Sequence, residues 1–307
     1  MTSRRKKTRT HVRPAENAPQ DKKAVPKSFV VKTGGVDVSK QCGQLVHDLR
    51  KVMEPNTASR LRERRANKLK DYLSMAGPLG VTHICMLSET ENTMNLRLAK
   101  FPRGPTLFFR VLDFCLAGDV RAAARRPKSP GLEFATAPLL VLNNFENEQR
   151  VDHQLMVTVL QNYYPTLNPA RMKLVDLRRV ALYHYDKERD VVLFRHFLIK
   201  VRERGLSKLS KALATGALPE NLSEYADIGD FVSDAMMMGA ASESEGEDDA
   251  TVTLGQDYLG PSNAKNTQRS ITLTEIGPRM TLKLIKITDG LNDGKVLFHV
   301  PSVDSSS

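Results

Sequence analysis

Histidine and cysteine, the side chains most often used in catalysis and metal binding, are scattered in this sequence. The seven histidines are His11, His47, His83, His153, His184, His196 and His299. Cys42, Cys85 and Cys115 share no metal-ligand spacing, and no zinc-protease helix, nucleophile elbow or glycine-rich phosphate loop occurs. Isolated acids such as Asp113 and Asp176 are not paired for metal-assisted or acid–base chemistry. The sequence therefore predicts a protein that is not an enzyme and takes no cofactor, metal or small-molecule substrate.

A short run of basic residues is the part of the chain best suited to binding a ligand. Between positions 60 and 70, one acid, Glu63, stands against six cations: Arg60, Arg62, Arg64, Arg65, Lys68 and Lys70. We predict a helix from about residue 56 or 57 to Leu73, which would place Arg60, Arg64 and Lys68 on one face, above an anchoring face of Leu61, Leu69, Tyr72 and Leu73.

Two interpretations of this run remain open. It is an ordinary solvated face, or it binds an anion. Solvated helix faces usually pair Glu with Lys four residues apart, whereas here like charges repel each other. We therefore favour phosphate binding, which would provide affinity more than sequence specificity.

The overall charge agrees with a polyanionic partner. The 307 residues include 46 Lys+Arg and 35 Asp+Glu, a formal net charge of +11. There is no apolar core of a signal peptide and no run approaching the roughly 18 to 20 apolar residues of a membrane span. We expect no membrane association and a location in the cytosol or nucleus, where the three cysteines would be reduced and buried.

Three segments have compositions that argue against packing. Residues 1–26 are predicted to be a disordered basic arm, whose cluster at positions 4–7 is either a nuclear-import signal or a phosphate-binding tail. Residues 203–268 are predicted to be a flexible acidic insertion. Within it, Ser242 and Ser244 are either phosphorylated by an acidophilic kinase or part of an unmodified linker. Residues 301–307 form a tail.

Between these segments, hydrophobic periodicity predicts an α/β fold. Strands are expected at about 28–31, 81–87, 95–101, 106–114, 138–142, 177–185, 191–201, 271–276, 281–287 and 295–300, and further helices at about 39–53, 118–126 and 150–161. Residues 96–107 and 271–282 resemble each other, each with a Gly-Pro step beside an arginine. We therefore predict two related halves, at about 27–130 and 131–300.

The Gly277-Pro278-Arg279 junction allows two interpretations, a tight turn alone or a turn whose arginine also contacts RNA. The sequence has no Trp and no paired Phe/Tyr pattern of the kind that stacks bases on a sheet. This favours contact with the backbone of structured or double-stranded RNA over recognition of splayed bases.

Several motifs, taken in order, resemble the Brix-domain family, most closely its Peter Pan branch. The resemblance covers about Pro26 to Val300 and rests on residues 26–30, 68–72 with 77–83, 104–106, 167–171, and 275–279 with 282–284. It implies two pseudo-repeated halves similar to anticodon-binding domains. By position, it places RNA contacts on the run from Arg60 to Lys70 and at Arg103, Arg279 and Lys283.

The resemblance also implies a function. Members of this branch are nucleolar factors in large-subunit (60S) ribosome assembly, so we expect partners to be precursor ribosomal RNA and neighbouring assembly factors. A tRNA-binding accessory module and a DNA or chromatin adaptor are the alternatives. Relatives commonly extend into a Lys-rich tail, whereas this sequence ends at Ser307, so any RNA affinity lent by such a tail is in doubt.

Overall fold

A long mixed sheet organises the chain in the computed structural model, which describes residues 25–33, 39–64, 67–90, 93–125, 127, 131–145, 150–166, 177–203, 251–253 and 268–300. Its helices are α1 (Lys40–Met53), α2 (Leu69–Leu79), α3 (Ala117–Ala123), the short 3-10 helix η1 (Leu132–Ala135) and α4 (Val151–Tyr163). Its strands are β1 (Ser28–Lys32), β2 (His83–Glu89), β3 (Met94–Lys100), β4 (Thr106–Cys115), β5 (Leu139–Asn143), β6 (Arg179–Asp186), β7 (Val191–Glu203), β8 (Thr251–Thr253), β9 (Gln268–Glu275), β10 (Arg279–Thr288) and β11 (Val296–His299).

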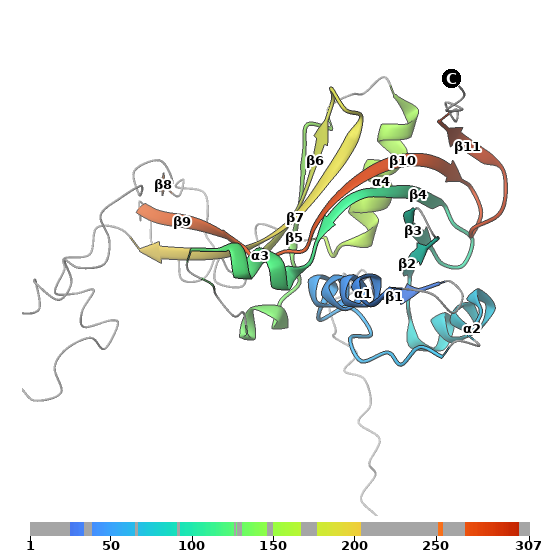
Figure 1. Ribbon diagram of the computed structural model, residues 1–307, viewed down its shortest axis with the longest axis horizontal. Coiled ribbons are helices and arrows are strands. Elements are labelled where there is room, and N and C mark those ends of the chain that lie inside the picture. Colours follow the sequence, from blue (N-terminus) through green and yellow to red (C-terminus); the bar gives the residue numbers. More distant parts are fainter. Residues whose placement is uncertain are drawn as a thin grey trace, which may run out of the picture.

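The strand order gives the sheet two similar ends. The main path runs β1-β2-β3-β4-β10-β7-β6-β5, with β11 beside β10, and β9 joining β7 to β8. At each end lies a parallel pair, β1–β2 and β5–β6, with a helical connection between its strands, whereas the pairs between them are antiparallel. In the middle, β4 and β10 pair along their lengths from Thr106↔Thr288 to Cys115↔Arg279. They form the long curved ribbon of Figure 1.

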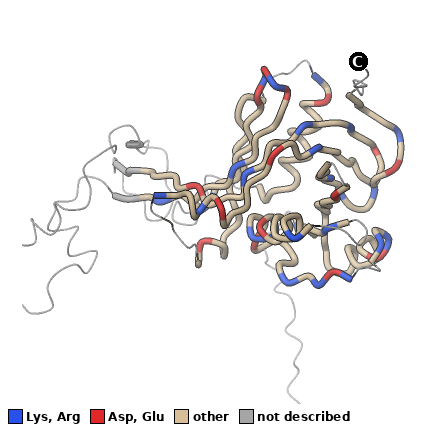
Figure 2. The backbone as a smooth tube through the Cα atoms, viewed as in Figure 1, with Lys and Arg blue, Asp and Glu red and all other residues tan. Residues whose placement is uncertain are grey.

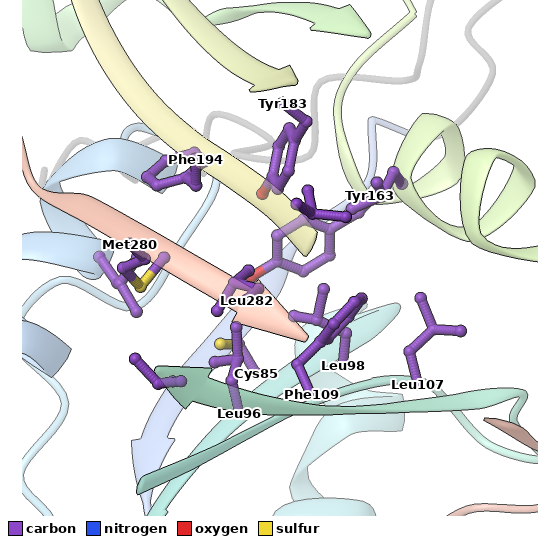
Figure 3. Close-up of a cluster of buried hydrophobic side chains, with 14 of the residues drawn as sticks. Cys85, Leu96, Leu98, Leu107, Phe109, Tyr163, Tyr183, Phe194, Met280 and Leu282 are labelled. Atoms are coloured by element: carbon purple, nitrogen blue, oxygen red, sulfur yellow. The ribbon is translucent and has the colours of Figure 1, made fainter. Parts of the chain in front are cut away.

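One face of the sheet is covered by α1 and α4. Ser39 begins α1, because its Oγ accepts from the Cys42 backbone N–H at 3.1 Å, and the apolar stripe from Cys42 to Met53 is buried. Side chains of α4 lie in the same cluster as the inward residues of β3, β4, β7 and β10. Figure 3 shows Tyr163 placed among Leu98, Phe109, Leu282 and Tyr183. The core is therefore shared by elements from early and late parts of the sequence.

On the opposite face, the described helices cover the sheet near β1, β2 and β3. There α2 buries Tyr72 and Ala76 against a smaller cluster that includes Phe29, Ile84 and Ala99. The helix continues through Pro78, and Gly80 ends it in the left-handed conformation at φ 66°. Beyond β3 this face presents partly exposed side chains of β4, β10 and β7.

A buried arginine joins late and early elements. Arg179 of β6 is 0 % exposed, and its guanidinium donates to the carbonyl oxygens of Lys51 (3.0 Å), Val52 (3.2 Å), Glu54 (2.6 Å) and Thr136 (2.7 Å). The first three belong to the last turn and C-cap of α1, where carbonyls lack helical partners. Burial lowers the pKa of Arg179 to about 10, which still leaves it charged at neutral pH.

Most predicted strands and helices are found, but the prediction of a helix from about residue 56 to Leu73 is wrong. The helix begins at Leu69, and the described residues from 54 to 64 are not helical. Residues of this stretch bond to β1 instead: the Asn56 carbonyl accepts from Ser28 N at 2.9 Å, and Thr57 Oγ1 donates to Ser28 O at 2.9 Å. Tertiary bonds and like-charge repulsion both disfavour a helix here.

The cysteines divide into two groups. Cys42 and Cys85 are buried, and burial raises their pKa values to about 11 and about 12, so both thiols stay protonated. Cys115 is exposed at the end of β4, where the expectation of a buried side chain is wrong. In the part of the chain that the structure describes, no helix is long and apolar enough to cross a membrane.

Candidate nucleic-acid interface

The basic run lies on the surface beside β1, at one end of the sheet. Arg60, Arg62 and Arg64 are exposed on a non-helical stretch, and Lys68 and Lys70 are exposed at the start of α2. Arg65 lies outside the described residues. The five described cations thus do not form a ridge on one helix. They follow an extended path that turns into α2, seen as blue segments along the stretch between α1 and α2 in Figure 2.

Glu63 pairs with a cation inside the protein. It forms an ion pair with Arg50 of α1, and both side chains are nearly buried, with exposures of 9 % and 11 %. Arg50 also donates to the carbonyl oxygens of Val30 (2.9 Å) and Leu61 (3.1 Å). The one acid of the run therefore anchors the stretch and does not neutralise its neighbours.

The exposed cations consequently lack a counter-charge. Among the described residues, no acidic group lies within ion-pair distance of Arg60, Arg62 or Arg64. The same stretch closes the outer edge of β1, because Glu63 also accepts from the Lys32 backbone N–H at 3.3 Å. An edge strand capped in this way is not free to pair with another chain, so the stretch offers side chains rather than backbone to a partner.

Arg279 is held by an acid. Its Nε and Nη2 donate to the two carboxylate oxygens of Glu275 at 2.6 and 2.7 Å, and this bidentate contact raises the pKa of Arg279. The contact leaves little of the guanidinium fork for another anion. Arg103, by contrast, is exposed in the turn before β4 and has no acidic partner in the described part of the chain.

The Gly-Pro junctions have packing roles. Gly277 has φ 69°, and a Cβ added there would lie 3.0 Å from the Cα of Ala117 and 3.1 Å from Val120. Gly104 has φ 96°, and its Cβ would lie 2.2 Å from the carbonyl oxygen of Asp289. Both positions thus require glycine because backbone passes close by, so close packing alone accounts for the Gly277 turn.

Lys283 lies within a second group of cations on the open sheet face. We call this area the basic face; it consists of the cations Arg97 of β3, Arg110 of β4, and Lys283 and Lys286 of β10, together with the ring of Phe108 that lies between them. Inward residues such as Phe109 and Leu282 alternate with these residues along the strands, which directs the group away from α1 and α4. Figure 2 shows blue segments along both β4 and β10.

The predicted site residues therefore occupy separate places. The basic run lies beside β1, Lys283 lies on the central ribbon, and Arg279 lies at the start of β10. Ala99 belongs to the smaller cluster that α2 buries. Arg97, two residues before it on β3, projects from the same face of the sheet. The basic face and α2 thus share one side of the sheet. Sequence reasoning missed Arg97, Arg110 and Lys286, although the alternation of apolar and basic residues along β3 and β10 was the available signal.

A cavity of about 120 Å³ lies where β7 and the Gly277 turn meet α1 and α3. His196, 1 % exposed, donates from Nδ1 to the Gly277 carbonyl oxygen at 3.0 Å, and burial lowers its pKa to about 3. Asp48 accepts from the Ala117 backbone N–H at 2.8 Å. Asp48 and His196 are thus each engaged with a backbone group. No set of three or more His, Cys, Asp or Glu suited to a metal occurs among the described residues.

Comparison with known proteins gives a consistent assignment. A family model described as Brix domain matches residues 35–286. A Brix domain-containing protein of Schizosaccharomyces pombe is 42% identical, over 96% of this chain and 79% of its own. Ribosome biogenesis protein SSF2 of Saccharomyces cerevisiae is 37% identical, over 97% of this chain and 78% of its own. The human Suppressor of SWI4 1 homolog is 41% identical, over 90% of this chain and 58% of its own.

Proposed function

The chain belongs to the Brix-domain family, in the Peter Pan branch that its motifs predicted, and from this premise we propose that it is a non-catalytic assembly factor for the large (60S) ribosomal subunit. It binds precursor ribosomal RNA and neighbouring assembly proteins in the nucleolus and holds an RNA fold while processing proceeds. The names of relatives, among them Ribosome biogenesis protein SSF2 and Peter Pan-like protein, support a role in ribosome assembly.

The observation that carries RNA binding is the uncompensated positive charge of the basic run. Arg60, Arg62 and Arg64 are exposed beside an acid that is already paired with Arg50. Cations without acidic neighbours gain most from phosphates, because each contact releases condensed counterions. We assign Lys68 and Lys70 to the same surface, with Arg65, Arg103 and Lys283 as further contacts, and Arg279 as a weaker one because of its pairing with Glu275.

A non-catalytic role is supported by how the titratable side chains are used. His83 and His196 are buried and kept neutral, with pKa values near 4 and near 3. Tyr185 donates to Asp190 at 2.5 Å, beside the Arg150–Asp152 ion pair, so these groups satisfy one another. General acid–base catalysis requires a group that titrates near the working pH and reaches a substrate.

The finer structural predictions belong to the same proposal. We propose that the two ends of the sheet descend from one repeated unit similar to an anticodon-binding domain, since each end consists of a parallel pair followed by antiparallel strands. The basic arm at 1–26 lies outside the described residues apart from Val25 and Pro26. The acidic insertion with Ser242 and Ser244 lies outside them apart from β8, Glu203 at the end of β7 and Gln268 at the start of β9. Their disorder and phosphorylation stay predictions.

Crosslinking and sequencing of RNA bound in cells tests this proposal. We expect reads concentrated on precursor RNA of the large subunit for the wild type. The triple variant Arg60→Glu, Arg62→Glu, Arg64→Glu should lose most of this signal, whereas a control with the same charge change, Lys187→Glu, Arg189→Glu, Lys295→Glu at exposed positions elsewhere, should keep it. Reads confined to mature tRNA, or recovery of genomic DNA in place of RNA, would favour the alternatives and overturn the assignment.

A further inference from the structure

We propose that the basic face, on the middle strands of the sheet, is a second RNA-binding surface that grips the phosphate backbone. This inference rests on the proposed function, because it assumes that RNA is the partner. The basic face is separate from the basic run and is made of residues from three strands: Arg97, Phe108, Arg110, Lys283 and Lys286.

The strand register brings the four cations together. Arg110 is the direct cross-strand partner of Lys283, and Phe108 is the partner of both Arg97 on one side and Lys286 on the other. Strands lie about 4.8 Å apart and residues about 3.4 Å apart along a strand, so the cations occupy a patch of roughly 10 by 7 Å. A patch of this size reaches two or three neighbouring phosphates on one strand.

The charges of the patch are not compensated within the described part of the protein. No carboxylate there lies within ion-pair distance of Arg97, Arg110, Lys283 or Lys286. Asp113, which pairs with Thr281, lies three residues beyond Arg110, and Asp289 lies three residues beyond Lys286; neither is within ion-pair distance of the patch. Like charges placed directly opposite each other destabilise a sheet, so the Arg110–Lys283 pair gains from an anion that bridges it.

Phe108 determines what kind of contact the patch makes. The Arg97 guanidinium lies 5.5 Å and the Lys286 ammonium 5.7 Å from its ring centroid, which places both cations in cation–π range. Arg97 also donates from Nη1 to Asn292 Oδ1 at 2.8 Å. A ring engaged by two cations is poorly available to stack on a base, whereas it orients both cations toward a shared anion. The surface is therefore suited to phosphates rather than to base recognition.

RNA fits the patch better than an acidic protein segment does. The basic face lies on the same side of the sheet as α2, whose first turn carries the exposed Lys68 and Lys70. Two uncompensated basic areas on one side match a long polyanion with regularly spaced charges. An acidic peptide remains an outcome that the experiment below distinguishes.

The test uses the full chain and a labelled mixed-sequence RNA duplex of about 20 base pairs. The variant is Arg110→Gln with Lys283→Gln, and the matched control is Lys187→Gln with Arg189→Gln in the exposed β6–β7 turn. Affinity is measured by fluorescence anisotropy at several salt concentrations. We expect the variant to bind about tenfold more weakly and its salt slope to fall by about 2, because two phosphate contacts are lost. The control should change affinity less than about twofold.

The possible outcomes separate this inference from the proposed function. If the wild type binds and the variant matches the control in affinity and salt slope, the basic face is not an RNA site, while RNA binding itself stands. If the wild type fails to bind the duplex, this inference fails, whereas the proposed function is decided by the crosslinking experiment. If the variant loses binding to polyglutamate but not to RNA, the face takes an acidic protein partner and the inference is wrong. The conservative variant Arg110→Lys with Lys283→Arg should keep the salt slope.

Discussion

At the scale of single residues, two histidines of this molecule are buried and neutral. His83 lies 3 % exposed beside the ring of Tyr163, with ring centroids 5.6 Å apart, and His196 packs under the Gly277 turn. Burial lowers the pKa of each well below the ordinary 6.5, to about 4 and about 3. Both imidazoles thus remain neutral in the folded protein at physiological pH.

We predict that these two histidines make the protein sensitive to mild acid. In the unfolded chain they take up protons as the pH falls through about 6.5, whereas in the folded chain they do not, so stability present above pH 6.5 is lost toward pH 4. Each should cost roughly 2 kcal/mol between pH 7 and pH 5. Urea unfolding at the two pH values measures this. The variant His196→Gln should lose about half of the dependence that these two histidines contribute; an unchanged dependence would contradict the assignment.

At the scale of elements, the turns that join strands are packed against distant backbone. The Gly277 turn lies against α3, and the turn at Gly104 lies against the loop that follows β10, where Thr106 Oγ1 donates to the Gly290 carbonyl oxygen at 2.7 Å. These contacts place the β4–β10 ribbon, and with it the basic face. The turns would thus contribute to the proposed RNA binding by positioning strands.

We predict that Gly277→Ala destabilises the protein by about 2 kcal/mol. The alanine would have to adopt the left-handed backbone conformation of Gly277, and its Cβ would lie 3.0 Å from the Cα of Ala117. Gly118→Ala in the adjoining α3 is the matched control. Nothing lies within 4 Å of its added Cβ, so its stability should be unchanged or slightly raised. Urea unfolding compares the two. Equal stabilities would show that the turn tolerates a side chain and that close packing does not explain this glycine.

At the scale of the whole molecule, the two ends of the sheet share one core. Side chains of α1, β3 and β4 lie in the same cluster as those of α4, β7 and β10. Arg179 of β6 satisfies carbonyls at the end of α1, and β10 covers the edge of β4 that would otherwise be open. The predicted halves therefore depend on each other for burial and for hydrogen bonds.

We predict that residues 27–130 alone do not fold cooperatively. Without β10 and α4 this segment exposes the edge of β4 and loses its contacts with Met156, Leu160 and Tyr163. Thermal unfolding followed by circular dichroism is expected to show a broad change for the segment and a sigmoidal transition for the full chain. A sharp transition for the segment would mean that each half is an independent domain.

The sequence by itself determined those features that depend on local patterns. Alternation and apolar runs located the strands from β1 to β7 and from β9 to β11, and the spacing from Ser39 to Met53 located α1, because these elements bury the face that their periodicity describes. Ordered motifs identified the family. The count of cations between Arg60 and Lys70 also identified an exposed basic segment, whatever its conformation.

Tertiary structure alone decided how those residues are arranged. The basic run is extended rather than helical because Arg50 binds Glu63 and Asn56 binds β1, and these partners are distant in the chain. Arg279 is neutralised by Glu275, while Arg97, Arg110 and Lys283 meet only because β3, β4 and β10 are neighbours. Local sequence fixes which residues are charged and which face they take, whereas strand pairing across more than 160 positions decides which charges meet.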